Sequence, residues 1–140
     1  MAKQILYVED NPNNVLLVQR IVAAEGHQLL VALDAVSGWE TAVTQQPDLI
    51  LMDLHLPGEM NGLDLTRRIK QHPALQHIPI VALTAHDSAA VESAALTVGC
   101  SGFLRKPADL RQIRQTLHTF LNGEGTAVTN QSTSPTFTFI

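Results

Sequence analysis

The chain of 140 residues contains one cysteine, few aromatic residues and no long apolar run. Cys100 has no second cysteine with which to form an intramolecular disulfide. No apolar stretch is long enough to cross a bilayer, and no signal peptide precedes the first apolar run, which begins at Ile5. The formal charge is only -4, and scattered Lys and Arg disfavour binding of nucleic acid or anionic lipid. These features predict a cytoplasmic protein.

Hydrophobic residues make up 45% of the chain and charged residues 16%, a balance typical of a soluble globular protein rather than a disordered one. A chain of this length falls within the usual size of one domain. We expect one folded domain over residues 1–122. Residues 123–140 are dominated by Gly, Ser and Thr and carry no charge after Glu124, which predicts a flexible tail. The alternation in Thr136 to Ile140 is typical of an edge strand, but the sequence offers it no partner.

Short apolar runs alternate with segments of helical period along the rest of the chain. Strands are predicted at 5–8, 28–33, 48–53, 80–83 and 102–104, and helices at about 12–25, 36–46, 63–72, 91–98 and 110–121. Asn11 is the expected N-cap of the first helix, with Pro12 at its first position and Gly26 at its end. Regular alternation of this kind requires parallel strands and right-handed crossovers, so the sequence predicts an α/β, doubly wound three-layer sandwich.

Polar side chains follow four of the five predicted strands at the point where each ends. Because ligands of open parallel sheets bind beyond the carboxyl ends of the strands, these residues are the candidate site: Glu9, Asp10, Asp53, Thr84 and Lys106. Each has an ordinary explanation by itself, such as an acid near a helix N-terminus or a solvated charge at a strand end. Chance placement of all five at one sheet edge is much harder to explain.

With these residues in place, the chain resembles the receiver domains of bacterial response regulators, from about Lys3 to Leu121. The resemblance is carried by an ordered set of motifs: Val8-Glu9-Asp10, Leu49 to Asp53 with Leu56-Pro57 and Gly62 downstream, Thr84-Ala85, and Lys106-Pro107. It implies a flavodoxin-like fold of five parallel strands in the order 2-1-3-4-5, flanked by five helices. It also implies a signalling switch rather than an enzyme, with self-catalysed phosphorylation from small donors and autodephosphorylation.

The resemblance implies a role for each residue of the candidate site. Asp53 would be the phosphorylated nucleophile, Lys106 would pair with the phosphoryl oxygens, and Thr84 would respond to them. Mg²⁺ would be held by Asp10, Asp53 and the backbone carbonyl of His55, with Glu9 reaching it through water. Such hard oxygen ligands suit this ion, which offsets the repulsion among the carboxylates.

The resemblance also implies how the domain would act on partners. Phe103 holds the position of an aromatic switch that follows Thr84, with an ordinary core phenylalanine as the alternative, and the Lys106–Pro107 bond is expected to be cis. The phosphoryl donor would be a histidine kinase or histidine phosphotransfer protein. A downstream protein would bind the surface formed by the fourth helix, fifth strand and fifth helix, which is also a candidate surface for a homodimer.

Two features depart from the family pattern or add to it. Gly62 lies nine positions after Asp53 where the family has eight, so Gly58 to Asn61 indicates a one-residue insertion beside the site. His55 and His86 each follow a site residue by two positions. We hypothesise that they tune the lifetime of the acyl phosphate by obstructing or orienting water, with exposed loop histidines of no role as the alternative.

Other functions fit less well. A phosphatase of the haloacid dehalogenase type needs a second acid two residues after its nucleophile, where this chain has His55. A flavodoxin needs a phosphate-cradling loop after the first strand, and Glu9 and Asp10 place negative charge there. A receiver module from a hybrid histidine kinase and a scaffold that signals without phosphorylation remain alternatives, although the intact acidic residues argue against the scaffold.

Overall fold

The computed structural model describes residues 2–85 and 89–121. Strands and helices alternate along the whole of this part of the chain. The order is β1 Gln4–Val8, α1 Pro12–Ala24, β2 Gln28–Ala32, α2 Ala35–Gln45, β3 Leu49–Asp53, α3 Gly62–Gln71, β4 Ile80–Thr84, α4 Ala89–Thr97, β5 Gly102–Arg105 and α5 Leu110–Leu121. The five strands form one parallel sheet in the order β2-β1-β3-β4-β5, which confirms the predicted topology.

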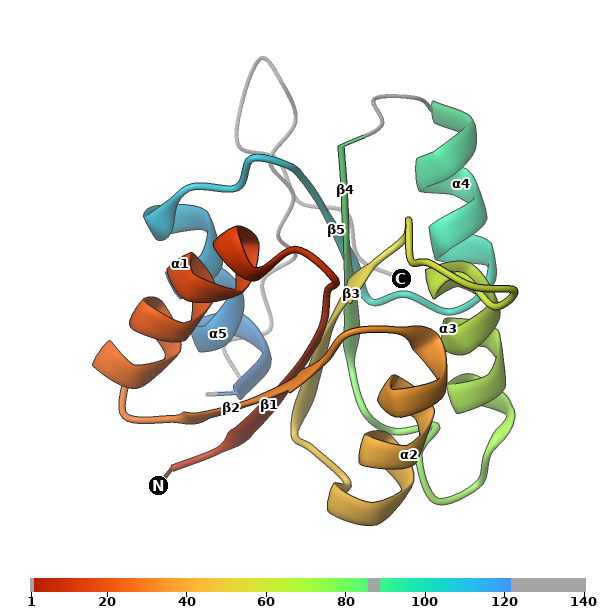
Figure 1. Cartoon of the computed structure of the whole chain (residues 1–140), viewed down its shortest axis with the longest axis horizontal. Helices are drawn as coiled ribbons and strands as arrows, with labels where there is room; N and C mark the ends of the chain where they lie inside the picture. The colour runs from red at the N-terminus through yellow and green to blue at the C-terminus, as the bar shows by residue number, and fades with distance from the viewer. Residues whose placement is uncertain (1, 86–88, 122–140) are drawn as a thin grey trace.

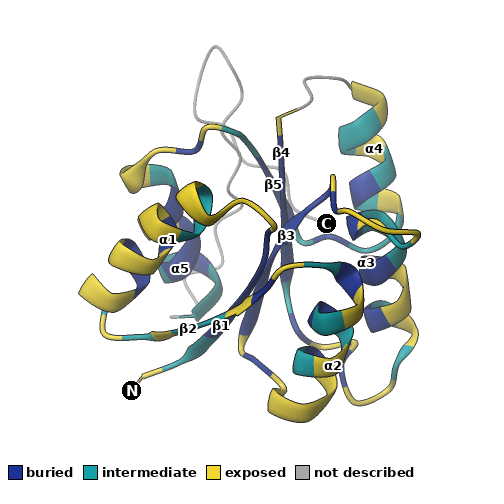
Figure 2. Ribbon diagram, in the orientation of Figure 1, coloured by how far each residue is buried: buried dark blue, intermediate teal, exposed yellow. Residues whose placement is uncertain are grey.

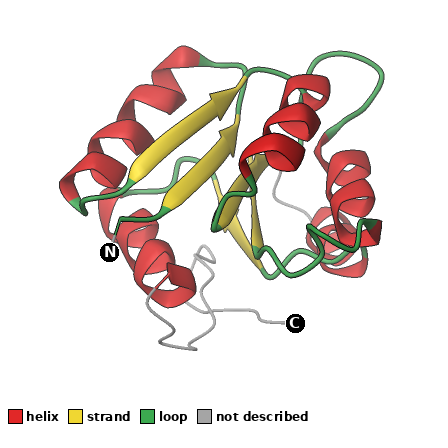
Figure 3. Ribbon diagram, turned by 90° about the horizontal axis from the view of Figure 1, so that it is seen from below, coloured by secondary structure: helices red, strands yellow, loops and turns green. Residues whose placement is uncertain are grey.

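The helices form a layer on each face of the sheet. Figure 1 shows α1 and α5 together on one face and α2, α3 and α4 on the other, and Figure 3 shows the strands between these two layers. The core is accordingly divided into two clusters, one on each face of the sheet. The sequences of the central strands are therefore nearly continuous apolar runs, because both faces of these strands are buried.

Burial is greatest in the central strands and falls toward the edge of the sheet. Every residue of β3 and β4 is buried, whereas β2, an edge strand, has a single buried residue, Ala32. Figure 2 shows that the centre of the sheet is buried and that the outer faces of the helices are exposed. β1 and β3 are adjacent central strands, so the residues that follow them leave the core at the same edge.

Local caps explain where the helices begin. The side chain of Asn11 accepts a hydrogen bond from the backbone N–H of Asn13, and Pro12 occupies the first turn, as predicted. Asp34 and Asn61 each form a reciprocal capping box at the start of α2 and α3. Gly26 ends the first helix region with a φ of +79°, which a side chain would oppose.

The predicted strand and helix positions are confirmed to within two residues at every end. The burial of α2 differs from the simplest expectation of its apolar pattern. Val36 is 59% exposed and Val43 37% exposed, whereas Ala35, Gly38 and Ala42 lie against the sheet. The close approach explains this choice, because a Cβ on Gly38 would meet side-chain atoms of Val8 and Leu65 at 3.0–3.2 Å.

Two predictions concern residues outside the described part of the chain. These are the hypothesis about His86 and the predicted tail at 123–140. Within the described residues, no helix is both long enough and apolar enough to span a membrane.

Candidate metal and phosphoacceptor site

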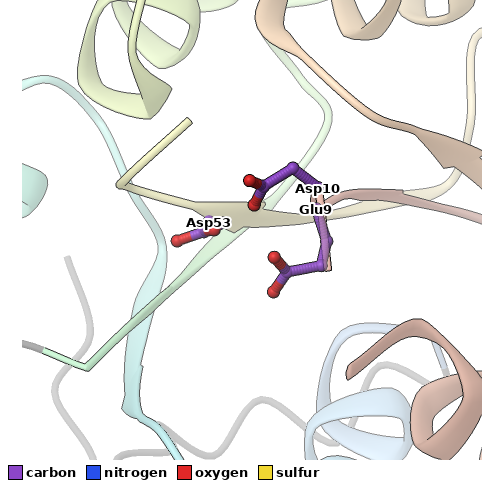
Figure 4. Close-up of side chains that lie close together, drawn as sticks. All are labelled: Glu9, Asp10 and Asp53. Atoms are coloured by element: carbon purple, nitrogen blue, oxygen red, sulfur yellow. The ribbon is translucent and has the colours of Figure 1, made fainter. Parts of the chain in front are cut away.

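The acidic residues predicted from the sequence meet where β1 and β3 end. Glu9 and Asp10 directly follow β1, and Asp53 is the last residue of β3. One carboxylate oxygen from each of the three residues lies within 4.8 Å of the others. Figure 4 shows the carboxylates of Glu9 and Asp10 directed toward Asp53. The paired central strands thus bring together acids that are 43 residues apart in the chain, from position 10 to position 53.

Glu9 is the most enclosed of the three acids, with only 1% of the residue exposed. Its Oε1 accepts hydrogen bonds from the hydroxyl of Tyr7 at 3.0 Å and from Nδ2 of Asn14 at 3.2 Å, and it also contacts Nζ of Lys106. Its Oε2 accepts the backbone N–H of Asn11 at 3.2 Å. Burial raises the pKa of Glu9, but the bond and charge of Lys106 outweigh it and lower the pKa to about 2.

Asp53 is 4% exposed and has fewer stabilising partners. Its Oδ1 accepts the backbone N–H of His55 at 3.0 Å, and its Oδ2 lies 3.5 Å from Nζ of Lys106. Burial raises the pKa of Asp53. The His55 N–H opposes this shift, the charge of Glu9 adds to it, and the resulting pKa is about 6. At neutral pH the carboxylate is ionised but costly to keep charged.

Lys106 follows the edge strand β5, and its side chain reaches both buried acids, Glu9 and Asp53. Its backbone N–H bonds the carbonyl of Thr84 at 2.8 Å, which continues the β4–β5 pairing by one residue. Its side chain is 17% exposed and pairs with both Glu9 and Asp53. One cation therefore balances part of the negative charge of the cluster and lies within reach of any group bonded to Asp53.

Gly62 allows the β3–α3 loop to close behind Asp53. A Cβ at this position would lie 2.2 Å from the carbonyl oxygen of Asp53 and 2.8 Å from Cα of Leu54. Gly58, in the segment predicted to hold a one-residue insertion, adopts a φ of +94° before this contact. The loop then returns to the end of β3, where the backbone N–H of Gly62 bonds the carbonyl of Leu54.

The chemistry of the cluster fits a hard divalent cation. The available ligands are carboxylate oxygens from three acids, and they line a cleft of about 250 Å³ together with Asn14, His55 and Lys106. Mg²⁺ prefers such oxygen ligands and is usually held by one or two carboxylates with water completing its shell. The carboxylates of Glu9, Asp10 and Asp53 offer only oxygen ligands, which suit hard cations such as Mg²⁺.

Thr84 and Phe103 are both buried near the acidic cleft, at the end of β4 and within β5. Thr84 is fully buried at the end of β4, and the next residue, Ala85, lines the acidic cleft. Phe103 is 7% exposed and packs in the core cluster on the face of α2, α3 and α4. The Lys106–Pro107 peptide bond is cis, as expected. The structure thus gathers Glu9, Asp10, Asp53, His55 and Lys106 around one cleft, with Thr84 just behind it.

Tyr7 and Asn14 were missed by the sequence reasoning, although both bond Glu9. Tyr7 lies two residues before Glu9, so the alternation of β1 places both side chains on one face. Burial raises the pKa of the Tyr7 phenol, and the nearby Glu9 raises it further, so the hydroxyl keeps its proton and donates a hydrogen bond to Glu9. Asn14 lies in the first turn of α1. The sequence shows both residues as polar groups near the end of a strand or the start of a helix. It does not show that both bond Glu9.

The fold and this acidic site together define a class of phosphorelay signalling proteins built on a flavodoxin-like sheet. The family model described as the response regulator receiver domain matches residues 5–118. The chain therefore belongs to the response regulator receiver domain family of two-component systems, and a single-domain receiver accounts for its described part.

Individual relatives agree with this assignment. The polar-differentiation response regulator DivK of Brucella anthropi is 32% identical over 121 residues, covering 86% of this chain and 98% of DivK. The receiver domain of the sensor histidine kinase PA1611 of Pseudomonas aeruginosa, solved with magnesium in its active-site cleft, is 29% identical with a TM-score of 0.79, covering 87% of this chain and 99% of that one. A response regulator structure from Chloroflexus aurantiacus has a TM-score of 0.82 at 23% identity, covering 87% and 99%, and supports the fold.

Proposed function

We propose that this protein is a phosphoacceptor switch in which Asp53 takes a phosphoryl group from a histidine kinase or histidine phosphotransfer protein. The observation that carries the proposal is the position of the Asp53 carboxylate. It is buried, it lies at the carboxyl edge of the sheet, and it has Lys106 at 3.5 Å. Nucleophilic carboxylates that form acyl phosphates need both an ionised oxygen and nearby positive charge.

In the proposed reaction a carboxylate oxygen of Asp53 attacks the phosphorus of a phosphohistidine. A new O–P bond forms, the N–P bond breaks, and its electron pair stays on the imidazole nitrogen, which is protonated from solvent. The Lys106 ammonium lies where it would stabilise the charge on the equatorial phosphoryl oxygens. The backbone N–H of His55 holds Asp53 in place.

The residues proposed to hold Mg²⁺ are Asp10, Asp53 and the backbone carbonyl of His55, with Glu9 acting through water. The bound ion would supply charge neutralisation between the carboxylates and the incoming phosphoryl oxygens. The magnesium in the PA1611 receiver supports this assignment, because that domain is 29% identical and shares the fold. The observation from this chain that supports it is the approach of three carboxylates to within 4.8 Å.

The proposed response begins at Thr84. A phosphoryl group on Asp53 would draw the Thr84 hydroxyl toward it, and Phe103 on the neighbouring strand would adjust to the vacated space. Phe103 lies opposite Ala82, two residues before Thr84, in the β4–β5 register. The surface formed by α4, β5 and α5 would then change its affinity for a downstream protein or for a second copy. Residues 1–122 would suffice for this switch, with 123–140 as a tail.

A receiver module of a hybrid histidine kinase is the second candidate. The likeness to the PA1611 receiver favours it, because PA1611 is itself a sensor histidine kinase. DivK, a response regulator, is matched over nearly its whole length. The chemistry proposed for Asp53 is the same in both cases, and only the source of the phosphoryl group differs.

Incubation with acetyl phosphate and Mg²⁺, followed by intact-mass measurement, tests the central step. We expect wild type to gain the mass of one phosphoryl group and Asp53→Asn to gain none. Glu59→Gln, an exposed acid in the same β3–α3 loop, is the control and should be labelled like wild type. Equal labelling of Asp53→Asn and wild type would show that the phosphoacceptor lies elsewhere.

A further inference from the structure

The outer edge of β2 is unusually apolar for a strand edge. Within residues 2–85 and 89–121, no strand pairs with this edge, because β2 is the first strand of the sheet. Exposed strand edges usually carry a charge, a proline or a bulge that prevents pairing with another chain. The sequence from Gln28 to Leu33 has no charged residue and no proline. β2 also pairs with β1 in an uninterrupted register, so it has no bulge.

Exposed apolar side chains gather at this same edge. Val31 is 41% exposed, Leu33 58% and Val36, at the start of α2, 59%. Among the described residues, only four other large apolar side chains have comparable exposure, and they are spread over α1, α2 and α5: Leu16, Leu17, Val43 and Leu110. Three of the seven exposed large apolar side chains in this part of the chain therefore fall within positions 31–36, in or just after β2.

The backbone of β2 is also oriented for pairing. The N–H of Gln28 bonds the carbonyl of Lys3, and the carbonyl of Ala32 accepts the N–H of Glu9, both toward β1. Because this direction alternates along a strand, Leu29 and Val31 present their N–H and C=O groups outward. Leu29 packs with the α1 and α5 cluster, so the side chain of Val31 lies on that same face.

We propose that the edge of β2 pairs with the same edge of a second copy of this chain, forming an antiparallel, two-fold symmetric dimer. A two-fold axis perpendicular to the sheet keeps each face continuous, so residues of equal parity must lie opposite one another. By the same alternation Leu33 also points outward, and the register that pairs the outward-pointing groups of Leu29, Val31 and Leu33 puts Val31 on the axis and Leu29 opposite Leu33 of the second copy. Such an interface is self-complementary, as a closed dimer requires.

The lack of charge along this edge also suits a second copy. In the proposed register Gln28 lies opposite Asp34 of the second copy. No like charges face each other between these ends, since residues 28–33 are uncharged.

The dimer would leave both acidic clefts accessible. Antiparallel pairing points the carboxyl ends of the two sheets in opposite directions, so the two Asp53 sites lie at opposite ends of the assembly. The paired edge is also distinct from the surface formed by α4, β5 and α5, at the other side of the sheet. A single pair of strand edges with Val36 at its rim is smaller than most stable interfaces, so we expect a dissociation constant of roughly 10–100 µM.

Sedimentation velocity of the full chain over a wide concentration series gives the first test. Wild type should shift from monomer to dimer, and Val31→Lys should remain a monomer. Leu110→Lys is the matched control, because Leu110 is 49% exposed and lies on α5. Thermal melting would confirm that each variant is folded. A monomer at every wild-type concentration, or dimers of Val31→Lys as stable as those of wild type, would overturn the proposal.

Cysteine cross-linking tests the register itself. Cys100 is fully buried, so we expect its thiol not to compete with an introduced, exposed cysteine in cross-linking. In the proposed pairing the two Val31 Cα atoms lie about 5.5 Å apart, within disulfide reach, whereas the two Leu33 Cα atoms lie about 14 Å apart. Val31→Cys should therefore form covalent dimers faster than Leu33→Cys, although Leu33 is the more exposed residue. Equal or faster cross-linking of Leu33→Cys contradicts the register.

A truncated chain that ends at Leu121 tests which occupant covers the edge of β2. The candidates are a second copy and the protein's own C-terminal residues. The proposal expects truncated and full-length chains to dimerise equally. Dimerisation that appears only after truncation would show that residues 122–140 cover the edge of β2, and would overturn the assignment to a second copy.

Discussion

Lys106 and Glu9 form an ion pair across 97 positions of the chain, with Glu9 almost completely buried. The pair joins the end of β5 to the end of β1, two strands that are not neighbours in the sheet. A buried carboxylate without a counter-charge is strongly unfavourable. Lys106 therefore has a structural role in addition to the role proposed for it in phosphoryl transfer.

Replacing Lys106 by alanine should lower the free energy of unfolding by about 2–3 kcal/mol at pH 7, less than a bare buried charge would cost because Tyr7, Asn11 and Asn14 still bond Glu9. The pKa of Glu9 is lowered in the folded protein, so the stabilising pair is present above pH 4.5 and is lost as the pH falls toward 2. Urea unfolding at several pH values should thus show a difference that shrinks in acid.

The exposed pair between Arg67 and Asp64 provides the control. Both side chains are about half exposed and their charged atoms are 3.5 Å apart. Arg67→Ala should cost less than about 0.5 kcal/mol, with little pH dependence. A Lys106→Ala variant no less stable than Arg67→Ala would show that Glu9 does not depend on its partner.

Asp53→Asn should stabilise the protein in the absence of Mg²⁺ by about 1–3 kcal/mol at pH 7. The pKa of Asp53 is raised to about 6, so keeping it ionised at pH 7 weakens the folded state. This destabilisation develops as the pH rises from about 4 through 6, and the neutral amide removes it. Thermal melts of both proteins at pH 4 and pH 7 should therefore diverge at the higher pH, while the exposed control Glu40→Gln should follow wild type at both.

The affinity for Mg²⁺ should fall as the pH falls through about 6. Protons and the metal compete for the Asp53 carboxylate, whose pKa is raised to about 6, so each pH unit below this value should weaken binding by up to tenfold. Isothermal titration from pH 5 to pH 8 measures the dependence. Asp53→Asn should bind more weakly and lose most of the pH dependence in this range; an unchanged profile would place the titrating ligand elsewhere.

Gly62→Ala should destabilise the protein by about 1–3 kcal/mol or more, because the new methyl group would lie 2.2 Å from the carbonyl oxygen of Asp53. The same displacement should slow labelling by acetyl phosphate, since it moves the backbone that carries the nucleophile. Gly26→Ala separates this contact from backbone strain, because Gly26 also resists a side chain through its φ of +79° but has open space around it. Gly26→Ala should leave labelling unchanged; equal loss in both variants would argue against the close contact as the cause.

His55→Ala should change the rate at which the phosphorylated protein loses its phosphate. His55 lies at the acidic cleft with an exposed side chain, where it can obstruct or orient water. Phosphate release after removal of the donor measures the rates. Identical rates in wild type and the variant would leave His55 with only its backbone role.

The sequence by itself determined the order of the strands and helices and the identity of the acidic residues. Alternating apolar runs and helical segments required a parallel sheet, and the carboxyl ends of its strands marked Glu9, Asp10, Asp53, Thr84 and Lys106. These inferences succeed because periodicity, caps and strand ends are local properties of the chain. The same local signals located the helix starts at Asn11 and Pro12.

The tertiary structure alone decided how the site residues share their charges. The local pattern gave no sign that Tyr7 and Asn14 both bond Glu9, or that Lys106 pairs with Glu9 as well as Asp53. It also left open which apolar residues of α2 face the sheet, a choice made by the close contact at Gly38. Distances between groups far apart in the chain depend on how all five strands pack. Burial raises the pKa of both Glu9 and Asp53, but the closer bond to Lys106 lowers that of Glu9, so the two acids shift in opposite directions.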